Sequence, residues 1–435
     1  MEKLFSEFTP STAQDWKQQI VKDLKGADYA KLVWHRGDGI EVQPFYTAEG
    51  AQHPEPVFTH AGWEICEEIT VKNEKDANEK ALKALNGGAS SLHFKLTKMP
   101  DLGVLLHDIS IEHIELCFTL RFLPEDFRTR LHSYAESRNM DPGQLRGGIC
   151  YDGIARLAET GHWITTDEHD LHADNNWIDA SLYQNAGATQ SFELACALAH
   201  AHEYLIELEQ KKKFRFTVSV GSDFFGEIAK LRALRKLWPL IAKEYRADEE
   251  ILIHVVNTSL NQSSLDAYNN MLRSTTEGMS AVIGGCNSLT LEAYNKSFES
   301  ANEFGERIAR NQQMIFKEES YLDKVADMGA GSYYIEMLTD ALAEKAWEEF
   351  KEIESKGGFL ACLESDYIQV RIRQQAGQLI NNFREEKVIL VGVNKFQNKN
   401  EARPAIRNFK RILTNTEVMP ITKISLSDYQ VKENA

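Results

Sequence analysis

The chain has 435 residues, 43% of them hydrophobic and 26% charged, so it is long enough for about two to three average domains or for one large α/β barrel with extensions. Its formal net charge of −16 argues against a protein that coats nucleic acid or an anionic membrane. A local basic pocket for a phosphorylated ligand is still compatible with this charge. The six cysteines are scattered without a CxxC pair, so we expect neither a disulfide scaffold nor a cysteine–zinc module. No apolar run approaches the ~18 residues of a membrane helix, and the N-terminus lacks the apolar stretch of a signal peptide. We therefore expect a cytoplasmic protein.

Residues 1–55 predict an arm rather than part of a core. A cap at Ser11–Thr12 and apolar residues spaced by four from Trp16 to Leu24 predict a short amphipathic helix. A glycine turn and a short strand follow at 37–42, and the prolines beyond them break regular structure. Such an arm can fold back on its own chain or lie on a partner, and spacing alone leaves both open.

From Trp63 onward, strand patterns alternate with helix patterns. We expect strands at 63–70, 90–94, 113–118, 177–182, 213–220, 251–256 and 288–290, and helices at 74–85, 124–136, 192–208, 224–241 and 266–282. This alternation indicates parallel βαβ units. About eight strands over roughly 260 residues favour a (β/α)8 TIM barrel at 56–345 over a doubly wound sheet, whose dinucleotide-binding GxGxxG string is absent.

After about residue 300 the pattern is mostly helical. We expect helices at 302–319 and 339–354, the second ended by Gly357-Gly358. The apolar run 388–393 predicts a late strand, and the polar residues after it are expected at the periphery. We therefore place a helical C-terminal extension and tail at 346–435.

Histidines and carboxylates give few signs of chemistry. The segment 167–174 holds four carboxylates and two histidines, but its polar surroundings favour a solvated loop, and we assign no metal site. His254 lies inside an expected barrel strand, a position that suits a general acid or a ligand contact; the pattern favours a hydrogen-bonded interior histidine instead. His200 and His202 lie on different sides of an expected helix, with His200 exposed and His202 half-buried.

Several strings of the chain resemble the methylmalonyl-CoA mutase family, in the family's order over nearly the whole length. They are Gly39-Ile40 with Pro44–Thr47, Asp223–Trp238, Asp266–Asn270, Gly284-Gly285 with Ser288-Leu289, Arg307–Asn311, Glu318–Ser320, Gly331–Glu336 and Val391–Phe396. The resemblance implies a substrate-binding (β/α)8 barrel. In the family a flavodoxin-like cobalamin domain follows it, and adenosylcobalamin serves the radical rearrangement that interconverts methylmalonyl-CoA and succinyl-CoA.

The resemblance also shows where this chain departs from the family's catalytic pattern. The histidine that serves the substrate thioester carbonyl aligns with Leu182, which can neither donate a proton nor hydrogen-bond a carbonyl. A glutamine facing substrate and cofactor aligns with Val256, a histidine with Thr290, and a glutamate that contacts the adenosyl group with Lys296. These positions imply no catalytic residue and no cofactor-binding residue in this chain. The substrate-facing candidates that remain are His254, Gln184 and Asn185.

These departures resemble the small subunit of the heterodimeric bacterial mutases, whose barrel is degenerate. The Asp-x-His-x-x-Gly hallmark of the cobalamin domain is absent, and too few residues follow Phe396 for that domain. The expected partner is the large catalytic subunit, which would carry the adenosylcobalamin, and the isolated chain is compatible with a homodimer. The aromatic residues of the arm, Trp16, Trp34, Phe45 and Tyr46, are expected to clamp that partner.

Two other functions stay open from the sequence. The chain can be an independent acyl-CoA mutase-like barrel that works with a separate cobalamin protein, which requires polar groups at the end of the barrel. It can also be a binding component that protects or loads the mutase, although no phosphate-binding loop is present.

Overall fold

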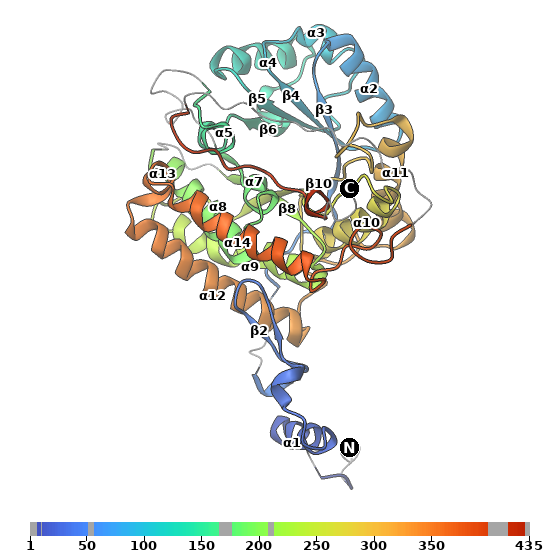
Figure 1. Ribbon diagram of the computed structural model, residues 1–435. Coiled ribbons are helices and arrows are strands. Elements are labelled where there is room, and N and C mark those ends of the chain that lie inside the picture. Colours follow the sequence, from blue (N-terminus) through green and yellow to red (C-terminus); the bar gives the residue numbers. More distant parts are fainter. Residues whose placement is uncertain are drawn as a thin grey trace, which may run out of the picture.

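Eight parallel strands form a nearly closed barrel with helices around it (Figure 1). The computed structural model describes residues 7–9, 11–50, 56–164, 176–207, 213–398 and 416–430. Within these residues the strand order is β6-β5-β4-β3-β10-β9-β8-β7, so that chain neighbours are sheet neighbours and β10 closes onto β3. The strands are β3 Glu64–Thr70, β4 Ser91–Leu96, β5 Glu115–Leu120, β6 Arg146–Cys150, β7 Trp177–Asp179, β8 Phe214–Val220, β9 Ile251–Asn257 and β10 Ser288–Thr290. The expected TIM barrel is confirmed.

Side chains of the strands alternate between the helices outside and the barrel interior. In β4, Leu92 and Phe94 belong to the apolar cluster that also contains buried residues of the surrounding helices. Between them, His93 points inward and lies against aromatic rings from β7 and β9. This period of two puts the apolar residues outside the barrel wall and the polar ones inside it.

Between β6 and β7 no strand ladder is present in the described residues, and a tryptophan fills this seam. The Trp177 carbonyl accepts a weak hydrogen bond from Cys150 Sγ at 3.7 Å, and its ring lies beside Gly148. The indole Nε1 donates to Thr217 Oγ1 at 2.8 Å, and the Arg215 guanidinium lies 4.6 Å from the ring centroid. Side-chain packing therefore replaces main-chain pairing at this one position of the wall.

The helices cover the outside of the barrel and continue beyond it. They are α2 Glu74–Asn86, α3 Leu102–Leu105, α4 Glu125–Ser137, α5 Gly153–Thr160, α7 Ser181–Asn185, α8 Gln190–Glu207, α9 Phe224–Ala242, α10 Asn269–Ile283, α11 Glu303–Met314, α12 Tyr333–Ser355, α13 Gly358–Glu364 and α14 Tyr367–Arg384. The π-helical turn Ile315–Glu319 extends α11. The domain boundary placed at residue 345 lies inside α12, which packs on α8 and α9. No helix in the described part of the chain is long and apolar enough to cross a membrane.

Helix α9 holds buried charge because α8 and α12 cover its outer face. The ammonium of Lys230, which is fully buried, lies 2.7 Å from Glu193 and 2.6 Å from Glu227. Arg232 pairs with Asp327 at 2.9 Å and with a carboxylate of α12. Lys230 and Arg232 thus each have two carboxylate partners, which offset the cost of burying their charge.

The N-terminal arm is docked at one end and projects at the other (Figure 1). Its hairpin, β1 Trp34–His35 with β2 Glu41–Val42, is held by Arg36, whose guanidinium contacts Asp223 and Gln190 at 2.5 Å each. The expected helix is α1 Ala13–Asp23, with Thr12 in a capping box, and none of its residues is buried.

Three local expectations were wrong, each for a physical reason. Strand β7 ends at Asp179 because α7 begins at Ser181, which shortens the expected strand 177–182. The run 388–393 forms a turn with a single bridge, not a strand. Strand β6 was not predicted, since Gly147 hides the pattern; this glycine has φ +113°, and a Cβ there would collide with the Leu116 backbone of β5.

Glu277 on α10 allows a test of how burial shifts the pKa of a carboxyl group in this protein. Its carboxyl is fully buried, accepts one hydrogen bond from Asn261 Nδ2 at 2.6 Å and leaves Oε2 without a partner, and burial raises its pKa to about 8. Between the ordinary carboxyl pKa and about 8 the folded chain holds a proton that the unfolded chain has lost, so this group lowers stability as pH rises. Glu277→Gln removes that penalty. We expect the variant to gain up to about 1 kcal/mol over the wild type for each pH unit between 5 and 8.

The measurement is urea unfolding of both proteins at several pH values. Glu79→Gln on the exposed face of α2 is the matched control and should show a constant difference. A constant difference for Glu277→Gln as well would mean that Glu277 titrates normally.

Candidate functional site

A polar cavity of about 190 Å³ lies at the mouth of the barrel, by which we mean the carboxyl ends of the eight strands and the loops after them. In TIM barrels this end holds the functional residues. The strand residues that line the cavity are Glu68, His93, Lys95, Thr119, Cys150, Trp177, Asp179, Thr217, His254, Val256 and Asn257, and the loop and helix residues are Ser181, Asn185, Ser259, Glu292 and Lys423. Most of these side chains are polar, in contrast to the few polar groups expected there.

The barrel interior contains a buried ion pair from opposite sides of the wall. Arg215 of β8 reaches Glu115 of β5 at 2.6 Å, and both side chains are buried. The Arg215 guanidinium also lies over the Trp177 ring, at 4.6 Å from its centroid. These three large groups occupy the interior beside the cavity, so the cavity stays smaller than the roughly 300–1,000 Å³ of typical ligand pockets.

His254 is held as a neutral interior histidine. Its Nδ1 shares a hydrogen bond with Ser288 Oγ at 2.8 Å, and its Nε2 lies 3.5 Å from Thr290 Oγ1. Burial, together with the positive charge of Arg215, lowers its pKa to about 4. The ring lines the cavity, but at neutral pH it is an uncharged imidazole and not an imidazolium that could act as an acid.

His93 was missed as a site residue although it faces His254 across the cavity. Its Nε2 bonds with Thr119 Oγ1 at 2.8 Å, its ring centroid lies 5.7 Å from that of His254, and burial lowers its pKa well below the usual value. The alternation of Leu92, His93 and Phe94 in an expected strand was the signal that places this ring inside the barrel.

A group of paired charges lies at the mouth. Glu68 accepts from Lys95 at 2.8 Å and from Lys296 at 3.1 Å. Lys296 also lies 2.7 Å from Glu292. Burial alone would lower the pKa of Lys296, but the carboxylates of Glu292 and Glu68 outweigh burial and raise it. Lys296 is therefore a cation held by carboxylates of its own chain.

The other family positions do not assemble a site. Val256 lines the cavity with an apolar side chain, and Thr290 is buried beside His254. Leu182 belongs to the main apolar core and does not line the cavity. The Leu182 side chain itself offers no acid and no hydrogen-bond donor.

The substrate-facing candidates separate into two places. His254 and Asn185 line the cavity, whereas Gln184 lines a second pocket of about 620 Å³ that also includes Arg36 of the arm hairpin. Gln184 Nε2 donates to Glu227 Oε1 at 2.6 Å. Position 184 therefore faces α9 and the arm rather than the interior of the barrel.

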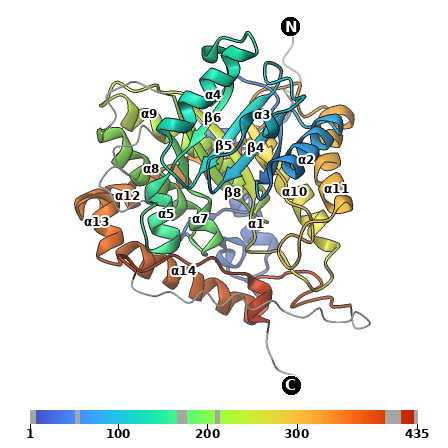
Figure 2. The same cartoon turned by 90° about the horizontal axis from the view of Figure 1, so that it is seen from above.

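A C-terminal segment, residues 416–430, crosses the mouth and is called the capping segment below. Backbone hydrogen bonds tie it to successive loops, from Ile421 N to Ala158 O at 2.7 Å and from Ile424 N to Asn185 O at 2.9 Å. Its Lys423 lines the cavity, and Figure 2 shows the segment at the same end of the molecule as α14. The expectation that these residues are peripheral is corrected, since Leu426 is buried.

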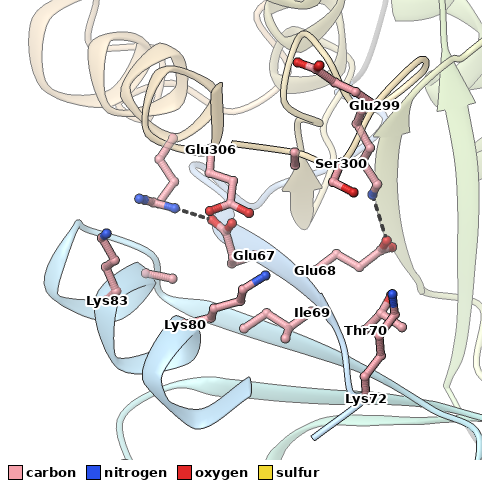
Figure 3. A pocket seen from close by; sticks show the side chains of 14 residues that line it. Glu67, Glu68, Ile69, Thr70, Lys72, Lys80, Lys83, Glu299, Ser300 and Glu306 are labelled. Atoms are coloured by element: carbon pink, nitrogen blue, oxygen red, sulfur yellow. Dashed lines mark hydrogen bonds and ion pairs between the residues drawn. The ribbon is translucent and has the colours of Figure 1, made fainter. Parts of the chain in front are cut away.

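A further pocket of about 400 Å³ lies between the carboxyl-terminal half of β3 and the helices α2 and α11 (Figure 3). Its lining mixes lysines with carboxylates, and several of these charges are paired. Glu67 pairs with Arg310 at 2.7 Å, and Glu68 turns to the other side toward Lys296. Paired charges of both signs make a weaker anion site than a cluster of cations.

The expectations for the histidines outside the cavity have different outcomes. The segment 167–174 lies outside the described residues. His200, expected at the surface, is fully buried, with Nδ1 bonded to Tyr183 Oη at 2.9 Å and Nε2 to Asp152 Oδ1 at 3.0 Å. His202 is partly buried, as expected.

Comparisons with known proteins agree on one family. A family model described as methylmalonyl-CoA mutase matches residues 94–427. The methylmalonyl-CoA mutase small subunit of Porphyromonas gingivalis is 33% identical over 92% of this chain and 72% of that protein. The methylmalonyl-CoA mutase small subunit of Streptomyces virginiae is 28% identical over 90% of this chain and 71% of its own length. The methylmalonyl-CoA mutase large subunit of Streptomyces virginiae is 24% identical over 89% of this chain, and the match covers 62% of that subunit.

Asn185 should act in structure rather than in substrate binding, because its amide is used within the chain. Its Nδ2 donates to Ser181 O at 2.7 Å and Ser219 Oγ at 2.8 Å, and its Oδ1 accepts from Thr258 and Ser259. We expect Asn185→Ala to lower the free energy of unfolding by roughly 2–4 kcal/mol, measured by urea unfolding.

Asn381→Ala on α14, an exposed asparagine, is the control and should change stability by less than about 0.5 kcal/mol. A similarly small effect at Asn185 would show that its hydrogen bonds are replaced by water and that the side chain is free for a ligand.

Proposed function

This chain belongs to the methylmalonyl-CoA mutase family, and from that premise we propose that it is the non-catalytic small subunit of a heterodimeric, adenosylcobalamin-dependent methylmalonyl-CoA mutase. Its role is to stabilise the large catalytic subunit. The observation that carries this proposal is the mouth of the barrel, where Leu182 packs into the core and the cavity holds only about 190 Å³.

Two positions that serve proton and hydrogen-bond chemistry in the family carry apolar side chains in this chain. Leu182 has no donor for a thioester carbonyl, and Val256 has none for substrate or cofactor. His254, the remaining histidine from the resemblance, is neutral and bonded to Ser288. A barrel in which the reactive positions are apolar while the framework is kept is consistent with a structural subunit.

Adenosylcobalamin does not fit the residues present at this mouth. Lys296 is fixed by Glu68 and Glu292 where the family has a glutamate, and the capping segment lies over the cavity with Lys423 in its lining. The proposal therefore assigns the cofactor, and the radical chemistry that it supplies, to the large subunit.

The arm supports the proposal of a partner. Phe8, Trp16 and Trp34 are each more than half exposed, and α1 buries none of its residues on this chain. The Trp16 ring packs against a neighbouring ring of the arm, Phe45, at a centroid distance of 5.7 Å. Exposed aromatic residues on a projecting element are typical of an interface with another protein.

The polar lining of the cavity favours a second candidate function, an independent acyl-CoA mutase-like enzyme that uses a separate cobalamin protein. His93, Lys95 and Asp179 supply the polar groups that such an enzyme needs. Two features weigh against it: the small volume, and the Arg215–Glu115 pair that fills the interior. A component that protects or loads the mutase remains the third candidate, with no observation in its favour.

The central test uses the chain alone and mixed with the large subunit of the same organism. We expect a one-to-one complex by light scattering, and turnover of methylmalonyl-CoA only in samples that contain the large subunit and adenosylcobalamin. Turnover by this chain with a cobalamin protein would support the second candidate. Separate elution at micromolar concentration would contradict the subunit proposal.

A single substitution tests whether the barrel is otherwise competent. Leu182→His should yield no turnover in the chain without the large subunit, because Val256, Thr290 and Lys296 also depart from the family pattern. Measurable turnover by this variant would mean that the remaining site is intact.

The arm is tested by removing residues 1–28, which leaves the hairpin and Arg36 in place. Since α1 has no buried residues, we expect an unchanged free energy of unfolding of this chain and a dissociation constant for the large subunit at least about tenfold higher. Trp16→Ala should show part of this effect. Phe304→Ala on α11, also about half exposed, is the control and should leave the dissociation constant unchanged. An unchanged dissociation constant after the deletion would exclude the arm from the interface.

A further inference from the structure

We propose that Cys66, His93 and His254 bind one transition-metal ion inside the barrel, and that Zn²⁺ is the ion this ligand set suits best. The three residues come from β3, β4 and β9, and one ligand atom from each lies within 4.8 Å of the other two. They are 4%, 5% and 2% exposed. This inference goes beyond the proposed function and does not depend on it.

The distances describe a site that needs only a small adjustment. In a tetrahedral zinc site, ligand atoms lie about 3.4–3.6 Å apart, given the usual Zn–N and Zn–S bond lengths. The ligand atoms of the three residues lie up to 4.8 Å apart, so side-chain shifts of about 1 Å bring them to the zinc distances. The barrel wall holds the backbone of all three residues in place, so no backbone movement is needed. Two of the three ligands were not candidates from the sequence, since they lie far apart along the chain.

Each histidine keeps one ring nitrogen for a ligand. His93 uses Nε2 with Thr119, and its Nδ1 has no partner although the residue is nine-tenths buried. His254 uses Nδ1 with Ser288, and its Nε2 has only the Thr290 hydroxyl at 3.5 Å. In metal sites, a second-shell group on the far nitrogen sets the tautomer and orients the ring in this way.

The protonation states suit a metal ion. Burial lowers the pKa values of both histidines, so that the imidazoles are neutral and their free nitrogens can donate a lone pair. Burial raises the pKa of the Cys66 thiol to about 12, so that Cys66 keeps its proton while no ion is bound. A coordinated thiol is deprotonated, and that proton passes to solvent when the ion binds.

The surrounding charges leave the site accessible to a cation. The nearby cations are already paired, Arg215 with Glu115 and Lys95 with Glu68. His93 and His254 both line the cavity at the mouth, which gives the ion a route in and leaves a fourth position for water. Three protein ligands with an open position are the pattern of accessible zinc sites, and a set of one thiolate and two imidazoles disfavours Mg²⁺ and Ca²⁺.

The test uses the full chain, stripped of metal by a chelator, and Co²⁺ as a spectroscopic probe. We expect one Co²⁺ per chain, with a thiolate-to-cobalt charge-transfer band in the near ultraviolet and the visible bands of tetrahedral cobalt. Added Zn²⁺ should abolish these bands and raise the melting temperature. Absence of a stoichiometric ion, or a bound ion without the thiolate band, would overturn the proposal.

Variants identify the ligands. Cys66→Ser should remove the charge-transfer band, and His93→Gln and His254→Gln should each weaken metal binding at least about tenfold. Cys286→Ser is the matched control, because Cys286 is equally buried with a thiol pKa also raised to about 12, and should keep both band and affinity. His169→Gln with His172→Gln tests the other histidine-rich segment. Loss of binding in that double variant, with retention in Cys66→Ser, would place the ion elsewhere and refute this site. The band in the wild-type chain reports thiolate ligation directly, so the outcome does not depend on whether one variant folds.

Discussion

The ion pair between Arg215 and Glu115 is the contact on which the inside of this barrel depends. It joins β8 to β5 across the interior, and the same guanidinium lies on the Trp177 ring that fills the seam between β6 and β7. Its positive charge adds to burial in keeping His254 neutral. Removal of either partner would leave an unpaired charge in the interior, which costs far more than the loss of an exposed pair. This interaction thus spans the interior, limits the cavity and adds to burial in lowering the pKa values of the histidines.

The arm exposes apolar side chains, whereas the mouth of the barrel is lined mostly by polar and charged ones. The arm is attached through the buried Arg36 and through the stacking of Tyr46 on Tyr334, but its helix presents Trp16 outward. The mouth, by contrast, is covered by the capping segment, and its charges are satisfied within the chain. A projecting extension that exposes Phe8, Trp16 and Trp34 is suited to assembly with another chain, in line with the proposed function.

Much of the fold was predictable from the sequence because the barrel repeats a strong pattern. Strands with outward apolar residues, such as Phe214 to Val220, and capped helices, such as α1 after Thr12, carry local signals that survive folding. Strand β6 was missed because its pairing needs Gly147, and glycine has no strand signal. His200 was misplaced because α8 is covered on both faces, so its periodicity has no solvent side. The site was less predictable: Cys66, His93 and His254 meet only through the register of three strands, which no spacing along the chain reveals.

The seam between β6 and β7 divides the barrel into two packed halves. One apolar cluster holds residues of β3 to β5 with α2 and α4, and the other holds residues of β7 to β10 with α8, α9 and α12. Main-chain pairing joins the halves at β3 and β10, whereas at the seam the described residues form no strand ladder and the Trp177 side chain fills the gap. Local opening in a protein follows the boundaries of such cooperative units. We therefore expect amide hydrogens along β6 and β7 to exchange with solvent through a partial separation of the halves, and those of the β3–β10 ladder to exchange only on global unfolding.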